Sequence, residues 1–334
     1  MHEIIVLGGY GRVGRHCVSE LVETTRARVV VAGRSIQRAE QVASVFGERA
    51  RPAYANATDP RTLQPLIPGA VAVLACCGPS TQAVLEITVE THVPFIGLTA
   101  TLPETTSDLR PDEQAWKQQV PVILNAGAIP GLPGVLAELL TRRFATLHEI
   151  RIASTGPWTD TEAAQQDQRA LRQTPRPEGE ANAAEWSRPW RTLRWRFPEP
   201  IGVRWMRPAR SLDLHGFVDS HCVDRLVYLE PATGFIPSGV QQVLQRNRES
   251  GFALVAEAYR EPGDRAPEER ITLQAPDLLT ASAAAAGALA RRILRGNLPG
   301  GFFTPHEALN PAIFLEVIAK RGVRVTFSPE TAAQ

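Results

Sequence analysis

The sequence predicts an α/β protein, in which an N-terminal doubly wound parallel sheet precedes a second α+β domain built on a mixed, largely antiparallel sheet. Short apolar runs alternate with segments of helical periodicity through the first part of the chain, as in repeated βα units. The first run, Ile4 to Leu7, ends at Gly8-Gly9, and a helical pattern begins at Val13. Later, strand-like segments follow one another with turn-rich connections, which is typical of antiparallel strands.

The first part alternates expected strands and helices, and we expect it to form a domain over residues 1–126. Residues 70–77 are apolar throughout, which is typical of a strand covered on both faces. The expected strands are 4–7, 28–32, 51–57, 70–77, 94–98 and 121–125, and the expected helices are 13–23, 36–46, 61–66, 81–91 and 112–119.

The second part, residues 127–300, is expected to form the mixed sheet. Residues 159–188 are polar, contain Pro175 and Pro177, and are expected to form a long loop or lid. We expect a homodimer, because a mixed sheet has an open face to cover. Strands are expected at 148–153, 211–215 and 225–229, a hairpin at 252–259 and 270–275, and helices at 135–140, 281–294 and 313–320.

The charge balance excludes two classes of protein. The chain has 36 Lys and Arg against 35 Asp and Glu, a net charge of +1, which argues against a strongly basic nucleic-acid binder and a strongly acidic chain.

Lys117 and Lys320 are the only lysines. Most Schiff-base and lysine-base mechanisms are therefore excluded.

Neither the cysteines nor the apolar runs point to a secreted or membrane protein. Four cysteines in 334 residues are too few for a disulfide framework and form no CxxC or Cys/His spacing, so no metal site is expected. The N-terminus lacks the features of a signal peptide, and no apolar run reaches the roughly 18 residues that span a bilayer. We expect a cytoplasmic protein with no membrane partner.

The turn after the first strand carries a G-x-G-x-x-G motif, Gly9-Tyr10-Gly11-Arg12-Val13-Gly14. Its position after an apolar strand and before a helix is the context in which this motif binds a dinucleotide. Gly9 permits the tight turn, Gly11 lets the backbone approach the pyrophosphate, and Gly14 lets the helix pack on the strand. The N–H groups of the helix N-terminus then bind the phosphates. A glycine turn without a ligand is the alternative.

The residue after the second strand predicts NADP (NADPH) rather than NAD. An NAD enzyme of this type places Asp or Glu about 20 residues beyond the motif, to bind the ribose 2′-hydroxyl, but this sequence has Gly33-Arg34-Ser35. Arg34 can pair with a 2′-phosphate, Ser35 can add a hydrogen bond, and Arg38 can add charge one turn later. Alternatively, Arg34 is a solvated arginine at a helix start.

Two further segments follow strands whose carboxyl ends would face the ligand. Cys77-Gly78-Pro79 ends the strand 70–77, and the glycine-rich stretch from Gly127 to Gly134 follows the strand 121–125. Cysteine at such a strand end is more often a small buried hydrophobe than a reactive group. The expected cofactor-binding residues are Gly8, Gly9, Tyr10, Gly11, Arg12, Val13, Gly14, Gly33, Arg34, Ser35, Arg38, Cys77, Gly78, Pro79, Gly127 and Pro130.

These segments resemble the saccharopine dehydrogenase-like reductases. The resemblance rests on residues 6–14, 31–34 and 77–79, on Gly127 with 130–132, and on a C-terminal stretch from Leu279 to Val323. It implies an N-terminal Rossmann domain, a second domain on a mixed sheet, a C-terminal segment 301–334 that packs back near the first domain, and nicotinamide-dependent reduction. Where family members often carry an acidic strand end, this chain has residues 97–101, Gly-Leu-Thr-Ala-Thr.

Hydride transfer belongs to the cofactor, so the protein must orient the acceptor and handle a proton. The Tyr-x-x-x-Lys pair of short-chain dehydrogenases is absent, because no tyrosine has a lysine four residues later. His221, His215 and Asp277 are the candidate proton donors, the histidines because they titrate near neutrality. Each histidine has a structural hydrogen-bonding role as its alternative.

An arginine- and tryptophan-rich segment, residues 186–210, is the candidate substrate-binding surface. We expect Arg204, Trp205 and Arg207, together with Thr99, to hold an anionic substrate. Alternation through residues 194–197 (Arg-Trp-Arg-Phe) places the arginines on one strand face and the aromatic rings on the other. A solvated arginine face with an aromatic face in the core or in a dimer interface is the alternative.

Together these features predict an NADPH-dependent oxidoreductase that transfers hydride to the C=N bond of a small, anionic substrate. A protonated iminium needs less acid assistance than a ketone, which fits the absence of a catalytic lysine. Reduction of a conjugated C=C bond is one alternative, and it needs donors to the α-carbon and to an enolate oxygen. A non-catalytic NADPH-binding sensor or scaffold is another. Arginine with aromatic residues also binds single-stranded nucleic acid, but the neutral net charge argues against that partner.

Overall fold

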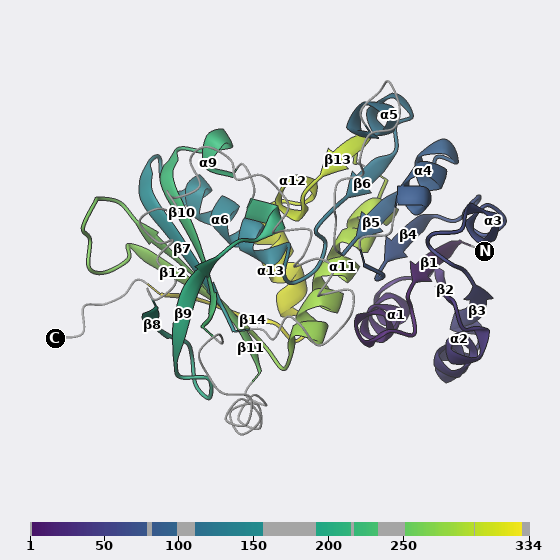
Figure 1. Cartoon of the computed structure of the whole chain (residues 1–334), viewed down its shortest axis with the longest axis horizontal. Helices are drawn as coiled ribbons and strands as arrows, with labels where there is room; N and C mark the ends of the chain where they lie inside the picture. The colour runs from purple at the N-terminus through teal and green to yellow at the C-terminus, as the bar shows by residue number, and fades with distance from the viewer. Residues whose placement is uncertain are drawn as a thin grey trace.

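The computed structural model describes residues 2–78, 82–98, 111–155, 192–214, 217–232, 251–296 and 298–328. It contains two seven-stranded sheets with helices between them (Figure 1). The expected loop or lid at 159–188 and three expected site residues, Pro79, Thr99 and His215, lie outside the described residues.

The first sheet has the order β13-β6-β5-β4-β1-β2-β3, and every described neighbouring pair in it is parallel. The chain proceeds from β1 to β3 on one side of β1 and from β4 to β6 on the other, so the predicted doubly wound sheet is confirmed. The strands are β1 (Glu3–Leu7), β2 (Arg28–Gly33), β3 (Ala50–Tyr54), β4 (Ala72–Ala75), β5 (Phe95–Gly97), β6 (Pro121–Ile123) and β13 (Gly301–Phe303).

Both faces of this sheet are buried. Successive residues of β1 point into two different core clusters. Ile4 and Val6 belong to one cluster, and Ile5 and Leu7 belong to the other. Such two-sided burial explains why the strands are apolar at successive positions. The connecting helices are α1 (Arg12–Thr24), α2 (Ile36–Ala43), the 3-10 helix η1 (Ser44–Arg49), α3 (Pro60–Leu63), α4 (Gln82–Glu90) and α5 (Pro111–Lys117).

The second sheet has the order β14-β12-β11-β7-β10-β9-β8. The β7–β10 pair is parallel and the other described pairs are antiparallel, so the predicted mixed, largely antiparallel sheet is confirmed. The expected hairpin is the β11–β12 pair. The strands are β7 (Leu147–Ser154), β8 (Leu193–Arg196), β9 (Val203–Ala209), β10 (Val223–Pro231), β11 (Phe252–Tyr259), β12 (Glu269–Ala275) and β14 (Arg324–Ser328).

One strand prediction was wrong. Residues 211–215 were expected to be extended, but the described part of this segment forms a 3-10 helix, η2 (Leu212–Leu214). The hydroxyl of Ser211 donates to Asp213 Oδ1 at 2.5 Å. Such local side-chain hydrogen bonds compete with a strand ladder, and this one favours the turn.

The alternation predicted for β8 is confirmed. Trp195 and, just after the strand, Phe197 are buried in a small core cluster with Met206, whereas Arg194 and Arg196 are exposed. The rings of Trp195 and Phe197 therefore stabilise the second sheet.

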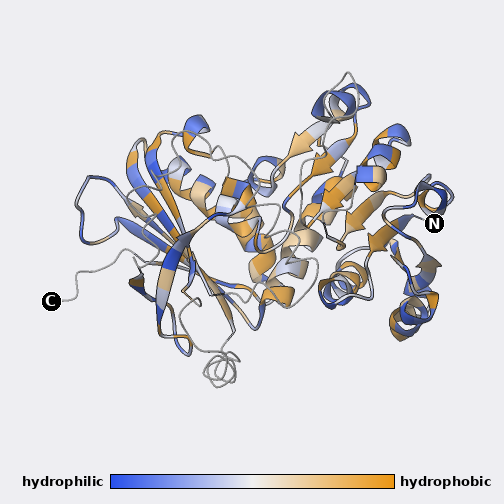
Figure 2. Ribbon diagram, in the orientation of Figure 1, coloured by the Kyte–Doolittle hydropathy of each residue, from blue (hydrophilic) through white to orange (hydrophobic). Residues whose placement is uncertain are grey.

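The described part of the chain has five further helices, namely α6 (Leu132–Arg143), α9 (Phe217–Ser220), α11 (Leu278–Leu294), α12 (Pro305–Ala308) and α13 (Pro311–Ala319). Apolar residues concentrate in the strands of the first sheet and in α11 and α13 (Figure 2). Within the described ranges, no helix is both long and apolar enough to cross a bilayer.

Helix α11 fixes the second half of the chain to α1. A Cβ on Gly287 would lie 2.5 Å from Glu20 Cγ, so the helices meet where α11 has no side chain. The buried Glu20 carboxylate accepts hydrogen bonds from Arg291 Nη1 at 2.9 Å and from Arg321 Nε at 2.8 Å. These contacts determine how the C-terminal half sits against the first sheet.

Candidate cofactor site

The glycine loop between β1 and α1 is packed backbone against backbone. A Cβ on Gly14 would lie 2.1 Å from Gly8 O, and a Cβ on Gly9 would lie 2.9 Å from Val6 O. Neither position tolerates a side chain without moving the main chain. Gly11 differs, because a Cβ there would meet Gly8 O at 3.0 Å and no other described atom within 4 Å. Gly9 and Gly14 are therefore packed against the main chain, whereas there is free space beside Gly11.

Helix α1 begins directly behind this open position. Gly11 is its N-cap residue and supplies no side-chain cap, and its first turn contains no acidic residue. The N-terminal N–H groups of a helix bind phosphate well, because they are unpaired and lie at the positive end of the helix dipole. The arrangement fits the pyrophosphate of a dinucleotide.

The β2–α2 turn carries the basic residues expected to select NADP. Arg34 and Arg38 are exposed, and the hydroxyl of Ser35 caps α2 by accepting the N–H of Arg38 at 3.4 Å. Tyr10 reaches this turn from the glycine loop. Its hydroxyl accepts the N–H of Ser35 at 3.1 Å, and the Arg38 guanidinium lies 4.6 Å from the centre of its ring.

The cysteines after β4 lie under the glycine loop. A Cβ on Gly8 would be 3.2 Å from the backbone of Cys76. A hydrogen bond with Cys17, together with burial, raises the pKa of the Cys76 thiol. Burial also raises the pKa of Cys77 to about 11, and the nearby Arg34 charge offsets part of that rise. Thiols with raised pKa values are poor nucleophiles, which favours the small-hydrophobe interpretation.

The stretch after β6 forms a second tight loop. Gly131 has φ +135°, and a Cβ there would lie 2.3 Å from the carbonyl oxygens of Asn125 and Gly127. The N–H of Ala128 donates to Ser282 Oγ at 3.2 Å, which ties the loop to α11. This loop continues into α6, which packs against β7 and β11 of the second sheet. The carboxyl edge of the first sheet is therefore connected directly to a helix of the second sheet.

Asn125 in this loop was not expected as a site residue. The residue is 8% exposed, and its Oδ1 atom has no hydrogen-bond partner among the residues that the structure describes. Its φ of +58° is one that asparagine tolerates better than most residues. The Asn-x-Gly sequence at a strand end is the signal that could have drawn attention to it.

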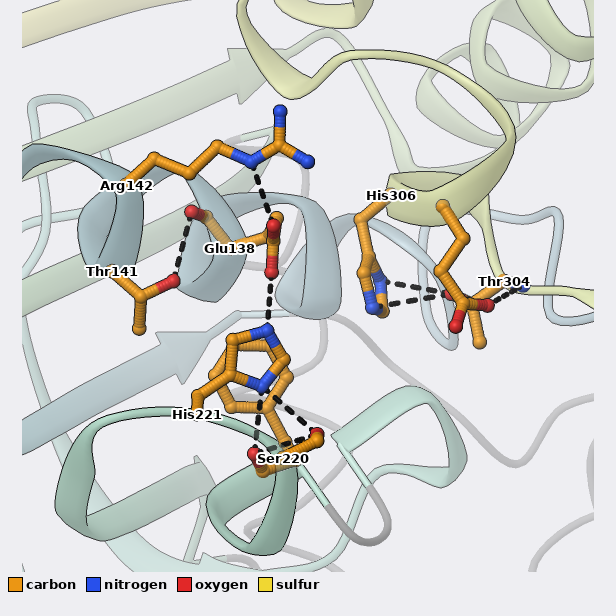
Figure 3. A network of polar contacts seen from close by, with 9 residues as sticks. Glu138, Thr141, Arg142, Ser220, His221, Thr304 and His306 are labelled. Atoms are coloured by element: carbon orange, nitrogen blue, oxygen red, sulfur yellow. Dashed lines mark hydrogen bonds and ion pairs between the residues drawn. The ribbon is translucent and has the colours of Figure 1, made fainter.

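His221 belongs to a polar network on α6 and α9 (Figure 3). Its Nε2 lies 2.5 Å from Glu138 Oε2, its Nδ1 lies 2.8 Å from the carbonyl oxygen of Phe217, and its ring stacks on Phe217 at 3.8 Å. Burial alone would raise the pKa of Glu138, but hydrogen bonds from Arg142 and His221 outweigh it and lower that pKa. Both ring nitrogens of His221 are therefore engaged by acceptors.

His306 on α12 joins this network from the C-terminal part of the chain. Its ring meets Phe217 edge-on at 5.9 Å. Burial lowers the pKa of His306, although the carboxylates of Glu307, Asp213 and Glu138 oppose the change.

Asp213 is a second functional candidate that the sequence did not reveal. Its carboxylate is 3% exposed and accepts the N–H of Gly134 at 2.6 Å, at the N-terminus of α6. Burial raises the pKa of Asp213, while hydrogen bonds from Ser211, Gly134 and Gly131 oppose the rise. A buried carboxylate from the second half of the chain thus holds the helix that follows the Gly127–Gly131 loop.

The other expected site residues lie elsewhere. Asp277 is the N-cap residue of α11 and accepts the N–H of Thr280 at 2.7 Å. Arg204, Trp205 and Arg207 lie on β9 in the second sheet. Trp205 is 59% exposed, and Arg207 pairs with Glu230 at 2.6 Å. The structure therefore brings together the described cofactor-binding candidates, at the carboxyl ends of β1, β2, β4 and β6, but not the catalytic and substrate-binding candidates that it describes, which are His221, Asp277, Arg204, Trp205 and Arg207.

Comparisons with known proteins agree with this architecture. A family model for the TrkA-N domain matches residues 4–95, the part that contains the glycine loop. Among solved structures, apo saccharopine dehydrogenase (L-Glu forming) from Saccharomyces cerevisiae is similar over 98% of this chain and 99% of that chain, with a TM-score of 0.66 and 12% sequence identity. This chain has a saccharopine dehydrogenase-like fold.

The saccharopine dehydrogenase-like fold includes both sheets, because the similarity extends over nearly the whole of each chain. An NADPH-dependent quinone oxidoreductase from Escherichia coli is similar over 41% of this chain and 52% of its own, with 20% identity and a TM-score of 0.29. A comparison with curated protein sequences gave no match. The first domain is thus of the NAD(P)-binding type, within a fold known from an oxidoreductase.

Proposed function

We propose that the chain is an NADPH-dependent oxidoreductase that reduces the C=N bond of a small, anionic substrate. The observation that carries the proposal is the glycine loop, where Gly14 and Gly9 are pressed against the backbone while Gly11 is open in front of an uncapped α1. A loop that only turned the chain would not need an open position at the helix N-terminus. A bound pyrophosphate does.

The β2–α2 turn supports NADPH over NADH. An Asp or Glu at the end of β2 would repel a 2′-phosphate, but this position is Arg34, which is exposed and one turn from the exposed Arg38. Arginine pairs with phosphate through two parallel hydrogen bonds. Two guanidinium groups at this turn favour the phosphorylated cofactor.

The described proton-donor candidates favour a reaction that needs little acid assistance. His221 has both ring nitrogens within hydrogen-bond distance of acceptors, and Asp277 is engaged in capping α11. Hydride transfer to the carbon of a protonated iminium neutralises a cation and needs no further proton, whereas reduction of a conjugated C=C bond needs a proton on the α-carbon after hydride reaches the β-carbon. The geometry therefore favours C=N reduction over the enoyl alternative. Arg204, half-buried on β9, is the candidate for holding an anionic substrate, although it lies apart from the cofactor-binding candidates.

NADPH consumption tests the reaction. The purified chain is incubated with NADPH and imines formed from an α-amino acid and a 2-oxo acid, and separately with α,β-unsaturated ketones and thioesters. The proposal predicts loss of NADPH absorbance with at least one imine and no loss with the unsaturated compounds.

Two variants serve as controls. Arg34→Ala should raise the KM for NADPH, since it removes a phosphate partner. Arg26→Ala should not change it, because Arg26 is exposed at the opposite, amino-terminal edge of the sheet, just before β2. Turnover of unsaturated compounds alone would contradict the C=N assignment. NADPH binding without turnover of either set would support the sensor or scaffold alternative.

A further inference from the structure

Tyr10 bridges the glycine loop and the β2–α2 turn. A Cβ on Gly33 would lie 2.4 Å from Tyr10 Cε1, so the ring rests directly on the backbone of the turn. Its hydroxyl accepts the N–H of Ser35 at 3.1 Å. Residue 33 must therefore be glycine for the ring to reach the turn, and the ring in turn holds the backbone from which Arg34 and Ser35 extend.

The ring also contacts Arg38. The guanidinium carbon lies 4.6 Å from the ring centre, within the range of a cation–π interaction. Arg38 is exposed on the first turn of α2. A free arginine side chain there would sample many rotamers, and ordering it on phosphate binding would cost entropy. Contact with Tyr10 restricts the guanidinium to the turn before any ligand binds.

We infer that Tyr10 is a positioning residue for the 2′-phosphate of NADPH, which holds the β2–α2 turn through Ser35 and the Arg38 charge through its ring. The inference rests on the proposed function. Because Tyr10 acts through Arg38 and the turn, it raises the affinity for the cofactor that carries a 2′-phosphate. It contributes little to the affinity for NADH. Selectivity between the cofactors, rather than affinity for dinucleotides in general, depends on it.

Calorimetric titration with NADPH and NADH tests this inference on the full chain. Removing the ring with Tyr10→Leu should raise the Kd for NADPH about tenfold, comparable with loss of one charge-assisted contact, and change the Kd for NADH less than about twofold. If Tyr10 acts through Arg38, then Tyr10→Leu should add less than about twofold in an Arg38→Ala background, because contacting residues are not additive.

Conservative and control variants separate positioning from folding. Tyr10→Phe keeps the ring and the Arg38 contact, so the ratio of the two Kd values should stay within about threefold of that of the parent chain. Tyr10→Met fills the space beside Gly33 without an aromatic face and should lose selectivity as Tyr10→Leu does, even if Tyr10→Leu does not fold. Arg26→Ala should leave both Kd values unchanged.

Three results would overturn the role of Tyr10. Equal weakening of NADPH and NADH in the folded Tyr10 variants would show that the residue only supports the loop, and full additivity with Arg38→Ala would show that it does not act through Arg38. A parent chain that binds neither cofactor would refute the proposed function itself. A parent chain that prefers NADPH, with unchanged preference in Tyr10→Leu and Tyr10→Met, would refute the role of Tyr10 alone.

Discussion

The carboxylate of Asp213 accepts the backbone N–H of Gly134 at 2.6 Å, so a buried side chain from the second half of the chain binds the N-terminus of α6. Helix α6 follows the tight loop at Gly127–Gly131, which leaves the carboxyl edge of the first sheet. A movement of η2 would therefore displace the N-terminus of α6 and, with it, that loop. The contact links the segment after β9 to the wall of the candidate cofactor site.

Replacement of Asp213 tests that link. Asp213→Ala leaves the Gly134 N–H buried without its acceptor, and we expect it to lower the free energy of unfolding by about 2–3 kcal/mol. Asp213→Asn keeps an acceptor and should cost about 1 kcal/mol or less. Urea unfolding of both variants measures the difference. Equal stability of the Ala and Asn variants would mean that the hydrogen bond to α6 contributes nothing.

Two glycine substitutions should affect different properties, one the stability of the fold and the other the binding of NADPH. Gly14→Ala places a Cβ 2.1 Å from Gly8 O and should destabilise the fold by about 1–3 kcal/mol or more, as overpacking does. Gly11→Ala, at φ −69°, should cost less than about 1 kcal/mol but prevent close approach of a pyrophosphate. Thermal unfolding and NADPH titration measure the two effects. A Gly11→Ala variant with unchanged NADPH affinity would place the phosphates elsewhere.

The ion network between α1 and the C-terminal half offers a matched pair of variants. Glu20 is 7% exposed and pairs with Arg291 and Arg321, whereas the exposed Glu23 pairs with Arg321 and accepts the hydroxyl of Ser19. Glu20→Ala removes the partner of the half-buried Arg291 and one of the two partners of Arg321, and should cost about 2–3 kcal/mol. Glu23→Ala should cost less than about 1 kcal/mol. Similar losses for the two variants in denaturant unfolding would contradict this account.

Stability should fall on mild acidification because of His306. Burial lowers its pKa below the value in the unfolded chain, so the folded state prefers the neutral ring. Stability is therefore fully present above about pH 6.5, the unfolded pKa, and is lost as the pH falls from there towards the folded pKa. His306→Gln should flatten this part of the stability curve. Glu307, Asp213, Glu138 and His221 remain in both proteins, so a slope that persists unchanged in the variant would assign the effect to those groups.

Local sequence patterns predicted the parts of the molecule that depend on neighbours in sequence. The first sheet, the glycine loop and the exposed Arg34 each follow from a short stretch, because a strand, a tight turn and a helix start are locally encoded. The same holds for β8, where alternation alone placed Trp195 on the face opposite to the arginines.

Contacts between distant segments could not be predicted in this way. His221 was singled out for its ring, but its partner Glu138 is 83 residues away, and the pair exists only because α9 meets α6. Asp213 was overlooked for the same reason, since Gly134 lies 79 residues earlier. At 211–215 apolar alternation suggested a strand, and a local hydrogen bond from Ser211 favoured a turn instead.

The central claim, that the glycine loop binds NADPH, is tested most directly by the melting temperature with NADPH, with NADH and without ligand, for the parent chain and for Arg34→Ala. NADPH at about 100 times its Kd should stabilise the fold by about 2.7 kcal/mol. The account predicts a clear rise with NADPH, a smaller one with NADH, and loss of that difference in Arg34→Ala. No rise with either cofactor would contradict it and leave the glycine loop with a structural role only.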